Sequence, residues 1–291
     1  MVVANPEDAR AISATETKHI VEVLIEERAP RLAASLAWPL AKAVLYPLLG
    51  YRKARALADT IAPMTGTEAF DFVSRLLALN LEVRSLDRVP DKGRLVLICD
   101  HPTGIADGIA VYDALKAVRP DVCFFANADA FRVCPGIGDR IIPVEWVEAK
   151  RTRERTRLTL QRAREAFEAE RAVVVFPSGR LARRGGGGKL KEEPWASSAL
   201  SLARKYEAPV APMHLEGPDS TLFHLFDRIS GELRDVTLFH ELLDKRGKTF
   251  RLFIGPLIEP ERIDPDAAAA TEALKAYITG VLPSDPDQVF P

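Results

Sequence analysis

From residue 81 onward, short apolar runs alternate with longer segments in which apolar residues recur every three or four positions. The short runs, rich in β-branched residues, have the length of buried strands, and the amphipathic segments have that of helices. Strands are expected at 81–86, 94–99, 121–126, 141–145, 172–176, 209–214 and 249–254. Helices are expected near 106–118, 151–170, 195–206 and 267–280. This alternation predicts the α/β class, with a mostly parallel central sheet of about seven strands flanked by helices.

The first 80 residues have a helical pattern instead. Asn5-Pro6-Glu7-Asp8 is typical of a helix start, because a capping residue precedes a proline and two acids. A loose apolar stripe continues to about Glu27, and a second amphipathic helix is expected at 67–80. We therefore predict an N-terminal helical segment, residues 1–58, that contacts a membrane, followed by one α/β domain, residues 59–291.

The stretch Leu32–Tyr51 is almost wholly apolar, and its 20 residues match the length of a membrane-spanning helix. However, Lys42 in its middle would cost ~3 kcal/mol at the centre of a bilayer. Pro39 and Pro47 are also expected to break the helix into short pieces. These features favour a kinked helix that lies in one leaflet, and the alternative is a buried helix that packs on the main domain.

The residues around this stretch fit the interfacial interpretation. Trp38 and Tyr46 are side chains that prefer the boundary between water and lipid. Arg52, Lys53 and Arg55 follow at once and would face anionic head groups. We therefore expect a peripheral or monotopic protein in contact with membrane lipids.

Composition narrows the classes of function. The chain is 47% hydrophobic and 28% charged, with a net charge of −1, so no overall field points to a nucleic-acid partner. Its three cysteines fall in or near apolar runs without a C-x-x-C pair, as expected for reduced thiols in a cytosolic compartment. No secretory signal is apparent at the start, so we expect the cytoplasmic face of a membrane.

The first candidate for chemistry follows the strand expected at 94–99. There the apolar run ends at His101, and Asp107 comes six residues later, in the first turn of the next helix. Pro102 and Gly104 mark the turn between them. A carboxylate on one imidazole nitrogen raises the basicity of the other, as a general base requires. The alternative is an ordinary polar histidine with an aspartate that offsets the helix dipole.

A second candidate follows the strand expected at 172–176. This run ends in Phe176-Pro177-Ser178-Gly179, and three arginines come next: Arg180, Arg183 and Arg184. Glycine lets a phosphate approach the backbone, and guanidinium groups bind phosphate with two hydrogen bonds. The alternative is a surface loop with solvated basic residues. Because ligands of parallel sheets bind beyond the carboxyl ends of the strands, both candidates are expected at one edge.

Taken together, these segments resemble the glycerolipid acyltransferase superfamily typified by bacterial 1-acylglycerol-3-phosphate acyltransferase (PlsC-like), over residues 67–258. Its four motifs resemble His101-Pro-Thr-Gly-Ile-Ala-Asp107, Pro135-Gly-Ile-Gly138, Phe176-Pro-Ser-Gly179 with Arg180 and Arg183, and Pro209-Val-Ala-Pro212. The His–Asp gap is five residues rather than four, and Ser178 replaces a glutamate. Both departures resemble the hemolysin-like or ornithine-lipid-type subgroup and leave the acceptor open.

The resemblance implies transfer of an acyl group from acyl-CoA or acyl carrier protein, as co-substrate, to a lysolipid hydroxyl. His101 would be the base and Asp107 would orient it, with no bound cofactor and no metal. The residues implied in substrate binding are Gly104, Phe176, Pro177, Ser178, Gly179, Arg180 and Arg183.

Two other functions stay open at this point. A metal-assisted hydrolase could use His101, Asp107 and the neighbouring Asp100. A catalytically silent, membrane-associated lipid-binding protein could share the same fold.

Overall fold

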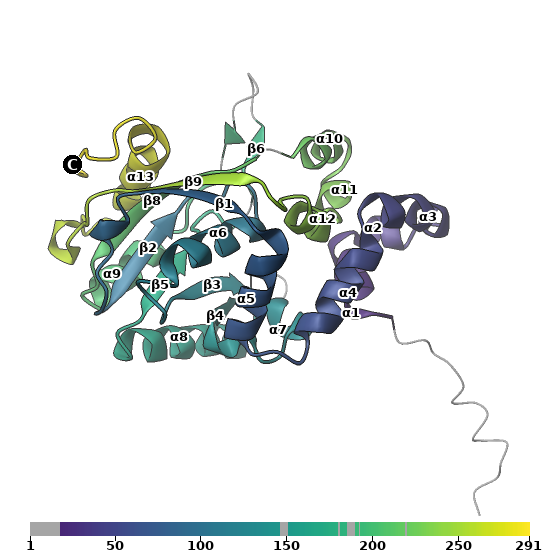
Figure 1. Ribbon diagram of the computed structural model, residues 1–291, viewed down its shortest axis with the longest axis horizontal. Helices are drawn as coiled ribbons and strands as arrows, with labels where there is room; N and C mark the ends of the chain where they lie inside the picture. Colours follow the sequence, from purple (N-terminus) through teal and green to yellow (C-terminus); the bar gives the residue numbers. More distant parts are fainter. Residues whose placement is uncertain (1–17, 146–150, 180, 185–189, 192, 219) are drawn as a thin grey trace, which may run out of the picture.

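The computed structural model describes residues 18–145, 151–179, 181–184, 190–191, 193–218 and 220–291 (Figure 1). Of the sequence-based expectations, the helix start at Asn5–Asp8 and the position of Arg180 lie outside these residues. For residues 183–184 and 190–191, the structure describes the backbone and not the side chains.

A seven-stranded sheet forms the centre of the molecule, in the order β1-β9-β8-β2-β5-β3-β4. Its strands are β1 (Asn80–Arg84), β2 (Leu95–Cys99), β3 (Cys123–Asn127), β4 (Ile141–Val144), β5 (Ala172–Val175), β8 (Val210–Glu216) and β9 (Thr249–Ile254). Neighbouring strands are parallel except β8 and β9, so β1 and β9 run against the other five. The predicted α/β class and mostly parallel sheet are confirmed. The two-residue strands β6 (Arg183–Arg184) and β7 (Leu190–Lys191) form a separate antiparallel pair.

Helices cover both faces of the sheet, as Figure 1 shows. One face carries α5 (Gly66–Leu77), α6 (Ile105–Leu115) and α12 (Leu238–Leu243), and the other carries α8 (Arg153–Glu168), α9 (Ser198–Lys205) and α13 (Ala267–Ala276). The central strand β2 is buried at all five positions because it faces both layers. Leu95, Leu97 and Cys99 contact the first layer, whereas Val96 and Ile98 contact the second. This alternation explains why the strand reads as a continuous apolar run.

Shorter elements complete the chain. They are the α-helix α7 (Ala130–Val133), the 3₁₀ turns Leu86–Arg88, Ile137–Asp139 and Pro260–Arg262, and a π-helical turn, Tyr277–Val281, that extends α13.

The segment Pro135–Gly138 packs against the start of α5. The Gly66 amide donates hydrogen bonds to the carbonyl of Gly136 and, at 2.7 Å, to the carboxylate of Asp139. A Cβ atom at Gly136 would lie 2.4 Å from the Met64 carbonyl oxygen, so only glycine permits this approach. In the described structure this segment therefore anchors a helix.

At one end of the molecule, α1 (Ile20–Arg28), α2 (Pro30–Ala33), α3 (Trp38–Leu48) and α4 (Tyr51–Ile61) lie beside α10 (Thr221–Ile229) and α11 (Gly231–Asp235) (Figure 1). Buried apolar residues from two distant parts of the chain, among them Trp38 and Phe226, form one cluster there. The Leu32 amide also donates to the Glu232 carboxylate at 2.8 Å. Helix α4 crosses the predicted boundary at residue 58, and this helical end is built from distant parts of the sequence.

The apolar stretch 32–51 folds differently from the expected single kinked helix. Pro39 lies in the first turn of α3 and Pro47 in its last turn, so neither proline breaks the middle of a helix. The breaks fall instead at 34–37, between α2 and α3, and at Gly50, whose φ is +68°. Among the described residues, no helix is long and apolar enough to cross a membrane.

Helix α3 has one buried face and one apolar exposed face. On the buried face, Trp38 donates from Nε1 to Glu26 at 3.0 Å, and Lys42 pairs with Glu22 at 2.5 Å. Trp38, expected at a lipid interface, therefore belongs to the interior. Leu40, Val44 and Leu48 on the exposed face, together with Leu36 in the turn before the helix, are spaced four residues apart and are 53–101% exposed; we call these four residues the α3 stripe.

Candidate active site

The His–Asp turn lies at the carboxyl end of β2, where the strand gives way to α6. The Nδ1 atom of His101 lies 2.9 Å from Oδ2 of Asp107. The Asp107 side chain is fully buried, whereas that of His101 is 16% exposed, so a substrate can reach the imidazole. The carboxylate therefore orients the ring through Nδ1, which assigns proton transfer to Nε2.

Asp107 is held by the turn that it closes. Its Oδ2 atom accepts hydrogen bonds from the amides of Thr103 and Gly104, each at 2.9 Å, and its Oδ1 atom accepts one from the Thr103 hydroxyl. The carboxylate also lies at the first turn of α6, where the helix dipole favours negative charge. These contacts hold the Asp107 carboxylate in place beside the imidazole.

Gly104 gives the turn its shape. Its φ of +96° and ψ of −138° belong to a region that residues with a Cβ atom rarely adopt. A Cβ atom there would also lie 3.0 Å from the Leu181 side chain. The geometry thus gives Gly104 a structural role, and its contact with substrate stays a prediction.

The second sequence candidate lies beside the first, because β5 pairs directly with β2. The Phe176 ring stacks on the His101 imidazole, with centroids 4.5 Å apart and planes 28° apart. The His101 carbonyl accepts a hydrogen bond from the Ala182 amide at 3.2 Å. The expectation that both segments meet at one edge of the sheet therefore holds for the described residues.

The turn after β5 is closed by its own backbone. The Gly179 amide donates to the Phe176 carbonyl at 3.0 Å, and Gly179 has a φ of +59°. The Pro177 carbonyl accepts from the Ala196 amide at 3.0 Å, and Ser178 is buried. A buried serine therefore occupies the position of the glutamate in the motif that the segment resembles. The substrate-binding roles of these four residues, and of Arg180 and Arg183, stay predictions.

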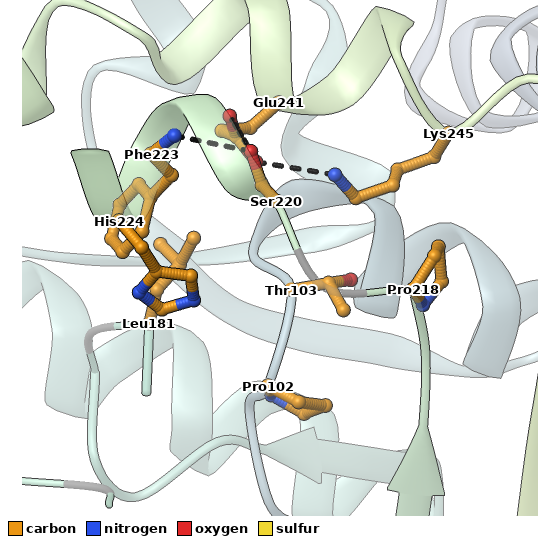
Figure 2. Close-up of a pocket in the computed structure, with 9 residues that line it drawn as sticks. All are labelled: Pro102, Thr103, Leu181, Pro218, Ser220, Phe223, His224, Glu241 and Lys245. Atoms are coloured by element: carbon orange, nitrogen blue, oxygen red, sulfur yellow. Dashed lines mark hydrogen bonds and ion pairs between the residues drawn. The ribbon is translucent and has the colours of Figure 1, made fainter. Parts of the chain in front are cut away.

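A small pocket adjoins the His–Asp turn (Figure 2). Pro102 and Thr103 form one wall, and the opposite wall consists of buried polar side chains: Ser220, His224, Glu241 and Lys245. The Glu241 carboxylate accepts from the Ser220 hydroxyl at 2.7 Å and from the Lys245 ammonium at 3.1 Å. This wall was not predicted from the sequence, where its one local signal is a glutamate and a lysine four residues apart.

A second imidazole–carboxylate pair, between Asp100 and His214, was also not predicted from the sequence. The Nδ1 atom of His214 lies 2.7 Å from Oδ2 of Asp100. The metal-assisted alternative would use Asp100 as a ligand, but this carboxylate is engaged by His214 and by the Leu215 amide. Among the described residues, no group of three or more His, Cys, Asp or Glu side chains is arranged to hold a metal ion.

Comparison with known proteins gives one matching family model and two similar curated sequences. Residues 80–216 match the family model described as Acyltransferase. Over 206 residues, the chain is 26% identical to a lyso-glycine lipid O-acyltransferase of Phocaeicola vulgatus, covering 68% of this chain and 71% of that protein. A protein of the same description from Bacteroides thetaiotaomicron is 21% identical over 212 residues, covering 70% of this chain and 75% of the other.

Among solved structures, the chain is similar to the 1-acyl-sn-glycerophosphate acyltransferase PlsC of Thermotoga maritima. The two share 13% identity at a TM-score of 0.44, with 92% of this chain and 97% of that chain covered.

Proposed function

We propose, from the match of residues 80–216 to the acyltransferase family model, that this protein transfers a fatty acyl group from acyl-CoA or acyl carrier protein to a lysolipid hydroxyl. The observation that carries the proposal is the His101–Asp107 pair, 2.9 Å apart at the carboxyl end of β2. A buried carboxylate behind a reachable imidazole is the arrangement that a general base requires.

The proposed reaction needs no covalent enzyme intermediate. Nε2 of His101 takes the proton of the acceptor hydroxyl while the oxygen attacks the thioester carbonyl. The tetrahedral intermediate then collapses, the C–S bond breaks, and the imidazolium returns its proton to the leaving thiolate. Asp107 stabilises the imidazolium between these two steps, because its charge is buried and 2.9 Å away.

A thioester assay tests this function. Purified protein with palmitoyl-CoA should release free thiol only when a lysolipid is added, and mass spectrometry should find the acylated lipid. Lysophosphatidic acid and lyso-glycine lipid are the two acceptors to compare, since the relatives found carry the latter in their names. Release without acceptor would indicate a hydrolase. No turnover with either acceptor, using acyl-CoA or acyl carrier protein, would favour the silent lipid-binding alternative.

We expect Arg183 to bind the anionic head group of the acceptor. A charged hydrogen bond of this kind contributes ~1.5–3 kcal/mol. Arg183→Ala should therefore lower kcat/KM for the acceptor by roughly 10- to 150-fold. Arg183→Lys should not restore it fully, because a point charge does not reproduce the planar guanidinium. Steady-state kinetics with each substrate varied separately measures the effect.

The neighbouring Arg184→Ala is the matched control, since it removes the same charge one residue away. If only the KM for the thioester donor changed, Arg183 would bind the donor rather than the acceptor. If neither Arg183→Ala nor Arg183→Lys changed the kinetic constants, the Arg183 side chain would be solvated.

The proposed place of action is the cytoplasmic face of a membrane, with the α3 stripe on the lipid. Arg52, Lys53 and Arg55, all exposed at the start of α4, would meet anionic head groups. The three cysteines Cys99, Cys123 and Cys134 are buried and are not joined in disulfides, which is typical of a reducing compartment.

Substitution within the α3 stripe tests this contact. Leu40→Glu with Val44→Glu should reduce co-sedimentation with phosphatidylglycerol–phosphatidylcholine vesicles by ~10-fold or more, because each apolar side chain contributes up to about 1.5–3 kcal/mol when buried in lipid. High salt should weaken wild-type binding only in part, since apolar contacts are not screened.

The control is Leu158→Glu with Leu160→Glu on α8, where two aliphatic side chains are 43% and 55% exposed. This control should bind vesicles as the wild type does. Equal binding by the α3 variant would refute the proposed contact.

A further inference from the structure

The sheet ladder between β2 and β8 ends one residue before Asp100. Its last partners are Cys99 and Met213, so Asp100 and His214 would form the next pair. The Asp100 side chain takes the place of that backbone contact. Its Oδ1 atom accepts a hydrogen bond from the Leu215 amide at 2.7 Å, and its Oδ2 atom lies 2.7 Å from Nδ1 of His214. Two successive residues of β8 therefore hold the carboxylate that directly follows β2.

The Asp100 carboxylate depends on these partners. Its side chain is 7% exposed, and this burial raises the pKa of the Asp100 carboxyl, which disfavours the ionised form. The imidazole of His214 and the amide of Leu215 oppose that rise, while the charge of Asp107 adds to it. Without His214, the carboxylate would keep one hydrogen bond from β8 and lose its imidazole partner.

His101 follows Asp100 directly and is held from three sides. The Asp100 carboxylate connects the backbone next to His101 to β8. Phe176 and Ala182 contact His101 from the β5 side, and Asp107 fixes Nδ1 of the His101 ring from α6. The contacts of Asp100 with β8 position His101 through the peptide unit between Asp100 and His101. Loss of these contacts would let the base shift by a fraction of an ångström, and proton transfer is sensitive to such shifts.

We propose that His214 is a positioning residue for acyl transfer: through Asp100 it fixes the peptide unit that carries His101. The proposal rests on the proposed function, since it concerns the same base. It implies that His214 acts through Nδ1 and does not touch either substrate.

Two amide substitutions separate Nδ1 from Nε2. The amide nitrogen of His214→Asn can occupy the position of Nδ1 and donate to Asp100, whereas that of His214→Gln lies nearer to Nε2. We expect His214→Ala to lower kcat by ~10- to 100-fold with both KM values nearly unchanged, as misplacement of a catalytic group does. His214→Asn should recover most of this loss, and His214→Gln should not.

Two controls test whether a variant is folded and whether removal of any histidine lowers kcat. His240→Ala on α12 should leave kcat unchanged, and thermal melts should show that each variant is folded. If His214→Ala does not fold, the contrast between the Asn and Gln variants decides. A folded His214→Ala protein with the wild-type kcat would overturn the proposal. The proposal would also be overturned if His214→Ala had a raised KM and His214→Gln restored activity, because that result would indicate substrate contact through Nε2.

A readout that needs no turnover separates this proposal from the proposed function. The chain has five histidines, and the ring signal of His101 in NMR spectra of histidine-labelled protein can be assigned with His101→Ala. His214→Ala should shift that signal, and His214→Asn should leave it near its wild-type position. Absence of transfer in the wild type would refute the proposed function, whereas an unmoved His101 signal would refute the positioning role.

Discussion

His101→Ala is expected to lower kcat/KM for acyl transfer by ~10²- to 10⁴-fold while the protein remains folded, which is the usual effect of losing a general base. The side chain is partly exposed, and the hydrogen bond from the Ala182 amide goes to the backbone carbonyl of His101, which alanine keeps. The loss of stacking on Phe176 should cost only a small part of the stability.

The measurement is the rate of thiol release at saturating donor with the acceptor concentration varied. The thermal melting temperature of each variant is measured as well. His101→Gln provides a matched variant, because its amide fills part of the space but cannot accept a proton at neutral pH. A folded His101→Ala protein with near-normal transfer would contradict the mechanism.

Asp107→Asn is expected to have an effect of similar size, ~10²- to 10⁴-fold on kcat, because an amide no longer stabilises the imidazolium or fixes the tautomer of His101. It should also lower the melting temperature. Asp107 is fully buried, and its carboxylate accepts hydrogen bonds from Thr103 and Gly104, so an amide NH₂ would leave one of these donors unpaired. Such a loss costs roughly 1–3 kcal/mol.

The double variant His101→Ala, Asp107→Asn separates the two effects of the aspartate. If Asp107 acts on catalysis only through His101, the double variant should be no slower than His101→Ala alone, although it should melt lower. Multiplication of the two kinetic losses would mean that Asp107 acts on the substrate by another route.

The contact between His101 and Asp107 was predictable because it is local. A strand, a turn with proline and glycine, and the first turn of a helix place two side chains six residues apart within reach of one another. The strands were predictable for a related reason, since a doubly covered sheet makes each central strand an apolar run such as Leu95–Cys99.

The contact between Asp100 and His214 was not predictable in this way. It depends on which strand lies next to β2, and neither residue signals that order. None of the helices α10–α12 was predicted from the sequence. In α12, Glu241 is buried as the partner of Lys245, and a buried charged residue disturbs the amphipathic pattern of that helix. The breaks predicted at Pro39 and Pro47 were wrong, because these prolines lie in the first and last turns of α3 rather than in its middle.

The three-sided hold on His101 has a consequence for the order of folding. The turn that carries His101 and Asp107 is complete by residue 107, but Ala182 lies 81 positions beyond His101, and Leu215 lies 115 positions beyond Asp100. A growing chain that ends before β8 already contains the base and its carboxylate, yet the loops that bring β5 and β8 to either side of β2 have still to close. Because such long loops close slowly and late, the catalytic geometry is a property of the finished sheet, and a nascent chain with both residues in place is not yet an active one.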